Sequence, residues 1–173
     1  TIDDFQTYFK PGKDTEEILV NELMNRTMQF IKPRLDVTDV KLHIKEHDKD
    51  DNQARILNYA NEVDQVIMNI LNNAIDVLVE LSHAQREIWI EVNNSNENVI
   101  ISIEDNGGGI EKEIIKKVFE PYFSTKSKNG TGLGLYMSKM IIEKHIGGRL
   151  DVKNTERGAS FTIVLPKKPR VSI

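Results

Sequence analysis

The stretch Asn98-Val-Ile-Ile-Ser-Ile-Glu-Asp105-Asn-Gly-Gly-Gly109-Ile110 carries the pattern that decides the fold of this 173-residue chain. Its apolar first half predicts a buried β-strand, which ends at an acidic residue and leads into three glycines. Glycines allow the backbone to approach a flat ligand closely. The carboxylate of Asp105 could accept a hydrogen bond there from an exocyclic amine, such as that of adenine. An ordinary Asp-Asn-Gly turn is the alternative.

Hydrophobic periodicity on either side of this stretch predicts further helices and strands. The predicted helices are 14–31, 61–81, 111–118 and 133–145, of which the first ends at Pro33 and the last at Gly147-Gly148. The predicted strands are 40–45, 55–59, 87–92, 98–104, 149–153 and 159–165, and 46–53 is expected to be a solvated loop. This order predicts an α+β fold, a two-layer α/β sandwich whose mixed sheet is covered on one face by helices.

The predicted helix 61–81 contains a group of polar residues, Asn69-Ile-Leu-Asn-Asn73-Ala-Ile-Asp76. Asn69 and Asn73 are four residues apart and therefore share one helix face, with Asp76 near the same stripe. A neutral amide oxygen is a suitable ligand for a Mg²⁺ ion that already holds phosphates and waters. A helix edge that faces solvent is the alternative.

A third segment, Gly130-Thr-Gly132-Leu-Gly134-Leu135, comes directly before the last predicted helix. Backbone amides spaced by glycines at the start of a helix can bind an anion. The segment lacks the Gly-Lys-Ser/Thr of a Walker loop, and no strand leads directly into it as in a dinucleotide-binding motif. A flexible surface loop is the alternative.

Composition narrows the class of protein. Apolar residues make up 39% of the chain, which is enough for one well-packed domain with a short extension. The net charge of −4 argues against a nucleic-acid partner. The absence of cysteine excludes disulfides and cysteine-ligated metal sites, and it is consistent with a reducing compartment. No apolar run approaches the roughly 20 residues that span a bilayer.

Taken together, these motifs resemble the catalytic domain of sensor histidine kinases. That domain belongs to the Bergerat-type ATPase superfamily, which includes type II topoisomerases, mismatch-repair ATPases and heat-shock chaperones. The resemblance covers residues 14–166. It rests on the N box at 69–74, the first glycine box at 105–110, the F box Phe119-Glu-Pro-Tyr-Phe-Ser-Thr-Lys126, the second glycine box at 130–135 and the closing strand at 158–166. The F box distinguishes kinases from the other members of the superfamily.

The resemblance implies a role for each matching residue. Asp105 would bind the adenine amino group, Asn73 would hold Mg²⁺ with Asn69 beside it, and Lys126 would approach the terminal phosphate from a short polar lid. Phe119 and Phe123 would fasten that lid to the domain. The implied catalytic residues are Asn69, Asn73 and Lys126. The implied nucleotide site comprises Asn69, Asn73, Asp105, Gly107, Gly109, Ile110, Phe119, Thr125, Lys126, Gly130, Thr131, Gly132, Leu133, Gly134 and Leu135.

The resemblance also implies a division of the chain and a set of partners. Residues 1–12 would end a dimerisation helix and its linker, 13–167 would form the catalytic domain, and 168–173 would be a tail. The domain would transfer the γ-phosphoryl of Mg·ATP to a histidine on an upstream dimerisation domain, for relay to an aspartate of a response regulator. The parent protein would be a homodimer and the present chain a monomer. It would be cytoplasmic, with any membrane anchor lying upstream.

Several features bear on rival functions. None of His43, His47, His83 and His145 lies in a phosphoacceptor motif, so we expect the acceptor elsewhere. Asp76 departs from the basic residue that many such kinases carry three positions after the metal-binding asparagine.

One rival function is that of an ATPase of the clamp or chaperone kind, which would need a catalytic acid such as Glu62 or Asp64. A degenerate nucleotide-binding domain used only for protein contacts is the other.

Overall fold

The computed structural model describes residues 17–47, 55–57, 60–82, 85–125 and 130–168. Several sequence-based expectations therefore lie outside the described residues. They are the end of a dimerisation helix at 1–12, most of the loop at 46–53, the end of the strand at 55–59, the lid residues 126–129 with Lys126, His83, and most of the tail at 168–173.

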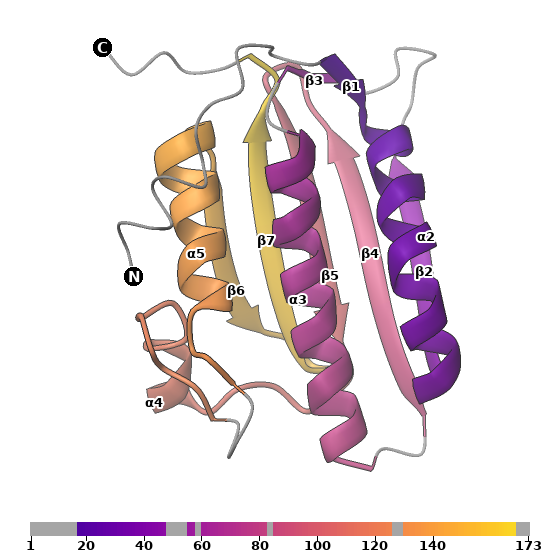
Figure 1. Cartoon of the computed structure of the whole chain (residues 1–173), viewed down its shortest axis with the longest axis vertical. Helices are drawn as coiled ribbons and strands as arrows, with labels where there is room; N and C mark the ends of the chain where they lie inside the picture. Colours follow the sequence, from indigo (N-terminus) through magenta and orange to yellow (C-terminus); the bar gives the residue numbers. More distant parts are fainter. Residues whose placement is uncertain (1–16, 48–54, 58–59, 83–84, 126–129, 169–173) are drawn as a thin grey trace.

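Two layers make up the fold, a five-stranded sheet and the helices that cover one of its faces (Figure 1). The strand order is β2-β4-β5-β7-β6, and the β2–β4 pair is parallel whereas the other pairs are antiparallel. The strands are β2 (Val40–His47), β4 (Arg86–Asn94), β5 (Asn98–Asp105), β6 (Arg149–Asn154) and β7 (Ala159–Pro166). This confirms the predicted α+β sandwich with a mixed sheet.

The covering layer consists of α2 (Val20–Thr38), α3 (Ala60–Glu80) and α5 (Gly134–Met140), which continues as the π-helical segment η1 (Ile141–Ile146). A four-residue helix, α4 (Lys112–Ile115), follows β5. Two short strands, β1 (Glu17–Leu19) and β3 (Arg55–Leu57), pair with each other in a separate small sheet.

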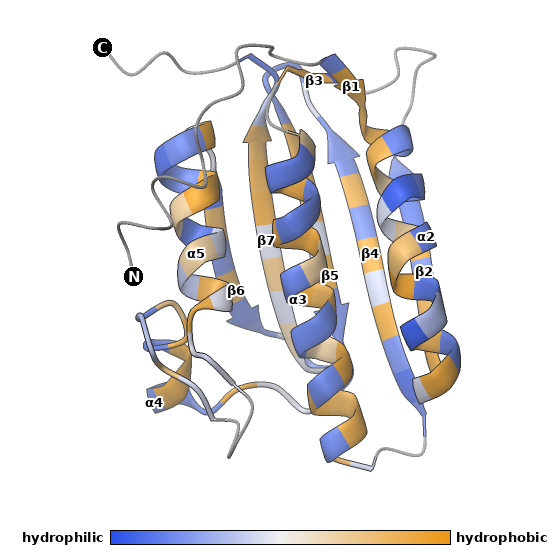
Figure 2. Ribbon diagram, in the orientation of Figure 1, coloured by the Kyte–Doolittle hydropathy of each residue, from blue (hydrophilic) through white to orange (hydrophobic). Residues whose placement is uncertain are grey.

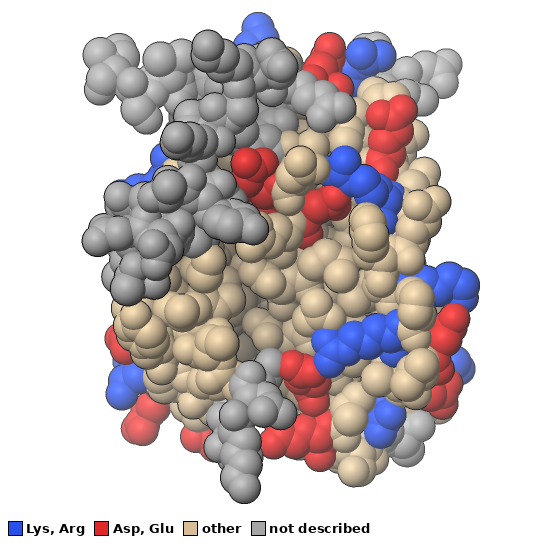
Figure 3. All heavy atoms as spheres, viewed as in Figure 1, with Lys and Arg blue, Asp and Glu red and all other residues tan. Residues whose placement is uncertain are grey.

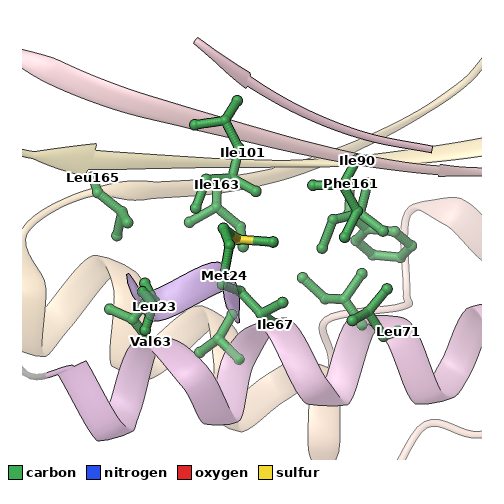
Figure 4. Close-up of a cluster of buried hydrophobic side chains, with 14 of the residues drawn as sticks. Leu23, Met24, Val63, Ile67, Leu71, Ile90, Ile101, Phe161, Ile163 and Leu165 are labelled. Atoms are coloured by element: carbon green, nitrogen blue, oxygen red, sulfur yellow. The ribbon is translucent and has the colours of Figure 1, made fainter. Parts of the chain in front are cut away.

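The core lies between the two layers, where the apolar sides of the helices face the sheet (Figures 2 and 4). Val63, Ile67 and Leu71 of α3 are buried against residues of the central strands. In β5, alternate residues Val99, Ile101 and Ile103 are buried on the helix side, and Asp105 is the next residue in that alternation. The strand period therefore turns the carboxylate toward the helices, into the layer that contains the core.

The first predicted helix is wrong at both ends. Glu17–Leu19 is a strand because Ile18 pairs with Ile56 of β3, and both side chains are buried in the core. Pro33 does not end the helix but lies inside α2, although proline lacks the amide hydrogen that an α-helix uses. The helix continues because Ile31 and Leu35, on either side of Pro33, are buried against the rest of the core.

The other boundaries differ from the prediction by small shifts. Glu46 and His47 belong to β2 instead of the expected loop, and the predicted helix 111–118 shrinks to α4. The last helix stops at Gly147 as predicted, because this residue adopts a left-handed backbone with φ 78°. In the part of the chain that the structure describes, no helix has the length and apolar character needed to cross a membrane.

Candidate nucleotide-binding site

A cavity of about 300 Å³ opens where α3, the end of β5 and the segment before α5 meet. It contains most of the residues of the predicted nucleotide site. The residues of that set that line it are Asn73, Asp105, Gly109, Ile110, Thr125, Gly130, Thr131, Gly132, Gly134 and Leu135. The fold thus brings residues of the N box and of both glycine boxes to one cavity.

Asp105 is the buried acidic residue of this cavity, with 6% of its surface exposed. Its Oδ1 accepts a hydrogen bond of 2.8 Å from the Gly107 amide. Burial raises the pKa of Asp105, which outweighs the lowering by the backbone amides of Gly107 and Ala159. The neighbouring charge of Glu104 adds to the rise. A further donor that entered the cavity would be favoured, since it would help to compensate a carboxylate removed from water.

The other walls include apolar side chains that were not among the predicted site residues. Ala74, Val77, Ile114, Val118 and Phe161 line the cavity together with Ile110. Val77 could have been found from helical spacing, because it lies one turn after Asn73 on α3. Ala74 follows Asn73 in the N box and could have been found as well, whereas Ile114, Val118 and Phe161 come from segments whose approach depends on the fold. An apolar slot with one buried acceptor fits a planar base that carries an amine.

The glycines of the two glycine boxes differ in what they permit. A Cβ at Gly107 would lie 2.8 Å from Val77 Cγ1, so the first loop can pass α3 only without a side chain. Gly132 has φ 69°, and its Cβ would lie 2.4 Å from the carbonyl carbon of Tyr122. At Gly134 a Cβ would meet no atom within 4 Å. Gly107 and Gly132 are therefore required by packing, whereas Gly134 leaves space at the cavity wall.

Four residues of the predicted set, Asn69, Gly107, Phe119 and Leu133, do not line the cavity, and Lys126 lies outside the described residues. Asn69 instead bonds α3 to α5. Its Nδ2 donates to Ser138 Oγ at 3.2 Å, and Ser138 Oγ donates to the Gly134 carbonyl at 2.8 Å. Asn69 thereby holds the second glycine box against the N-box helix.

Phe119, at the start of the F box, lies behind the cavity wall. Its ring makes an edge contact with Phe161, with 6.3 Å between ring centroids. The ammonium group of Lys139 lies 4.5 Å from the centre of the Phe119 ring. The F box is therefore attached to β7 and α5 through one aromatic side chain.

Asp76, the residue that departs from the expected motif, is paired with a base. It forms an ion pair with Arg34 of α2, and Arg34 also donates to the side chain of Asn72. A second ion pair, between Arg26 and Asp64, joins the same two helices. Acidic and basic side chains are interspersed over this helical face (Figure 3). The charge of Asp76 is thus compensated on the side of α2.

No group of three or more His, Asp or Glu side chains among the described residues could hold a metal ion alone. The metal ligand that the cavity offers is instead the side-chain amide oxygen of Asn73. This residue lines the cavity together with the glycines of the second box. Such a set fits Mg²⁺ only as part of a complex with phosphates, which supply most of its oxygen ligands.

Known proteins are similar to this chain in sequence and fold. The family described as "Histidine kinase-, DNA gyrase B-, and HSP90-like ATPase" matches residues 58–169. The signal transduction histidine-protein kinase AtoS of Escherichia coli is 33% identical over 156 residues, which are 90% of this chain and 24% of AtoS. Sporulation kinase E of Bacillus subtilis is 32% identical over 152 residues, 87% of this chain and 20% of the kinase. The chain thus spans about a quarter or less of these relatives.

Solved structures agree with the sequence comparison. The catalytic domain of histidine kinase ThkA superposes with a TM-score of 0.76 at 26% identity, covering 90% of this chain and 98% of that domain. ThkA in complex with the response regulator protein TrrA has the same fold, with a TM-score of 0.76 at 23% identity over 99% of this chain and 47% of that kinase. The chain belongs to the family of histidine kinase-, DNA gyrase B- and HSP90-like ATPases, as an ATP-binding catalytic domain of the histidine kinase type.

Proposed function

We propose that the chain binds Mg·ATP in this cavity and transfers the γ-phosphoryl group to a histidine on a separate dimerisation domain. The observation that supports this most is the convergence of Asn73, Asp105 and Gly132, from three distant segments, on one cavity. Each supplies a different requirement of a nucleotide, namely a metal ligand, a base acceptor and a backbone next to the phosphates.

The roles follow from the chemistry of each group. Asp105 accepts a hydrogen bond from the adenine amino group, and the Gly132 and Gly134 amides face the phosphates. Asn73 would hold Mg²⁺, which would supply positive charge beside the phosphates, and Lys126 would approach the terminal phosphate. Phosphoryl transfer depends mainly on positioning and electrostatic stabilisation. The protein therefore needs no nucleophile of its own, because the attacking nitrogen belongs to the acceptor domain.

We infer the partners from the similarity of this chain to histidine kinases. The acceptor histidine lies on the parent protein's own dimerisation domain, which residues 1–12 join to the catalytic domain at 13–167. The phosphoryl group passes from there to an aspartate of a response regulator, which the ThkA–TrrA complex supports. The parent is a homodimer, the present chain is a monomer, and the domain works in the cytoplasm.

The structure gives no support to the ATPase of the clamp kind. A clamp-type ATPase needs a catalytic acid on the N-box helix, and Asp64 is the candidate for it here. Asp64 instead forms an ion pair with Arg26 and accepts a hydrogen bond from Thr27, and neither Asp64 nor Glu62 lines the cavity.

Titration calorimetry with Mg·ADP tests the proposed site. We expect binding to the unaltered chain and a loss of roughly 1.5–3 kcal/mol in Asp105→Ala, the range for a hydrogen bond to a charged group. Guanine nucleotides should bind more weakly, because guanine presents a carbonyl where adenine presents the amine. Equal affinity for ADP and GDP, or no binding of either, would refute the proposed site. Asp36→Ala, on an exposed part of α2, is the matched control.

A further inference from the structure

The loop of the first glycine box must hold an unusual backbone at the cavity wall. Gly108 and Gly109 have φ angles of 84° and 88°, and Ile110, which follows them, lines the cavity. Consecutive glycines lose more conformational freedom on ordering than other residues. A loop of this kind keeps one geometry only if another part of the molecule fixes it.

Asn154, the last residue of β6, makes that attachment. Its Oδ1 accepts a hydrogen bond of 2.8 Å from the Ile110 amide, and its Nδ2 donates to the Ile110 carbonyl at 2.6 Å. One side-chain amide thus pairs with both backbone groups of one residue, as a neighbouring strand would. A Cβ at Gly109 would lie 2.9 Å from Asn154 Oδ1, so the glycine leaves room for the contact.

The turn that carries Asn154 is itself fixed. Thr155 accepts hydrogen bonds at its Oγ1 from the amides of Arg157 and Gly158, and it donates one to Glu104, next to Asp105. A Cβ at Gly158 would lie 2.3 Å from the Asp105 carbonyl oxygen. The β6–β7 turn therefore packs directly on the end of β5, and Asn154 projects from a rigid support.

We infer that Asn154 is a positioning residue of the nucleotide site, which sets the wall at Ile110 and through it the affinity for the base. This inference rests on the proposed function, because it concerns the same cavity. It adds Asn154 and the β6–β7 turn to the site, although the motifs include only Gly158 of this region, at the start of the closing strand. Asn154 acts on the base-binding side only, whereas the phosphates lie against the second glycine box.

The test compares binding of the base with binding of the phosphates. Asn154→Ala removes both hydrogen bonds, and Asn154→Asp keeps the shape but loses the donor to the Ile110 carbonyl. Calorimetry measures Mg·ADP, and NMR titration at the Gly132 and Gly134 amides measures Mg·tripolyphosphate. Asn96→Ala and Asn96→Asp are matched controls, because Asn96 is an exposed residue in the β4–β5 turn at the other end of the sheet.

We expect both Asn154 variants to bind Mg·ADP about threefold to tenfold more weakly, the value of one or two neutral hydrogen bonds, with unchanged tripolyphosphate affinity. The Ile110 amide should also exchange faster in Asn154→Ala. Equal losses for both ligands would show mere destabilisation and overturn the inference, as would unchanged ADP affinity. If the unaltered chain binds no Mg·ADP, the proposed function falls and takes this inference with it. Normal binding to the variants would refute the inference alone.

Discussion

Asp105 combines burial with charge, and this conflict can be measured. Burial raises its pKa in the folded chain above the unfolded value near 3.8. The folded state therefore holds the proton more tightly, and this group's contribution to stability is largest below pH 3.8 and falls as pH rises through the raised pKa. Above the raised pKa, the folded domain carries the cost of a buried carboxylate.

The variant Asp105→Asn should remove this pH dependence. Urea unfolding at a series of pH values should show its free energy of unfolding improving, relative to the unaltered chain, as pH rises from about 3.8. Asp36→Asn removes one exposed charge and serves as the control. A difference between Asp105→Asn and the unaltered chain that stays constant with pH would contradict the raised pKa.

The two glycines of the second glycine box should separate stability from binding. Gly132→Ala places a side chain on a left-handed backbone against Tyr122, so it should cost roughly 1–3 kcal/mol of unfolding free energy. Gly134→Ala meets open space, so it should keep or raise stability. Its methyl group at the cavity wall should weaken Mg·ADP by roughly tenfold. Chemical unfolding and calorimetry on both variants test this, and the reverse pattern would refute the assignment.

At the level of single residues, the predicted site includes Asn73 and Asp105, which line the cavity, but omits most of its apolar lining. Asp105 and Asn73 are conspicuous in the sequence because a polar side chain within an apolar pattern needs a hydrogen-bond partner or a ligand. Val118 and Phe161 look like ordinary core residues in the sequence. Their place in the cavity depends on how separate segments approach one another, which periodicity does not reveal.

Among the elements, α5 stabilises the F box through Lys139. The ammonium group of Lys139 donates to the Leu150 carbonyl at 2.8 Å, forms an ion pair with Glu143 at 3.1 Å and lies over the Phe119 ring. One side chain thus joins α5, η1, β6 and the F box at Phe119. Replacing Lys139 should therefore destabilise the F box before the rest of the domain.

We expect Lys139→Met to lower the free energy of unfolding by about 1–2 kcal/mol, since it removes a hydrogen bond and a cation–π contact but keeps the apolar stem. Hydrogen exchange should accelerate around Phe119 more than in β4. Lys144→Met, which alters an exposed lysine of η1, should change neither quantity. Uniform acceleration over the whole domain would contradict a local role for Lys139.

The elements also show where sequence patterns stop being informative. Alternation gave the strands of the large sheet nearly to their ends, and the broad apolar face gave α3. The β1–β3 pair was not predicted, because a three-residue strand around Ile18 looks like the first turn of a helix until its partner Ile56 is known. The predicted helix end at Pro33 was wrong for a related reason, because tertiary burial of its neighbours outweighs the low helix propensity of proline.

At the scale of the whole molecule, the sheet brings the site together. β5 lies in the middle of the sheet and ends at Asp105, and β7 beside it brings Phe161 to the cavity. α3 crosses the same region with Asn73. The central strands and the helix over them therefore fix the part of the cavity around Asp105, and the second glycine box closes it from the segment before α5.

The central claim is phosphoryl transfer to a histidine outside this chain. The chain supplies a nucleotide cavity, but none of its histidines lies in a phosphoacceptor motif. In the described part, His43 and His47 lie on β2 and His145 on η1, and none of the three lines the cavity. Transfer should therefore need the separate dimerisation domain. It should be slow in that arrangement, because the covalent tether that raises effective concentration is absent.

Incubation with γ-labelled ATP and Mg²⁺, with and without the parent's dimerisation domain, tests this claim most directly. Acid and base treatment of the products identifies the bond, because phosphohistidine is labile in acid and stable in base. We predict no label on the 173-residue chain alone, and acid-labile label on the added domain that disappears with Asp105→Ala. Acid-labile label on the isolated chain, or an added domain that stays unlabelled although the chain binds Mg·ATP, would contradict the account.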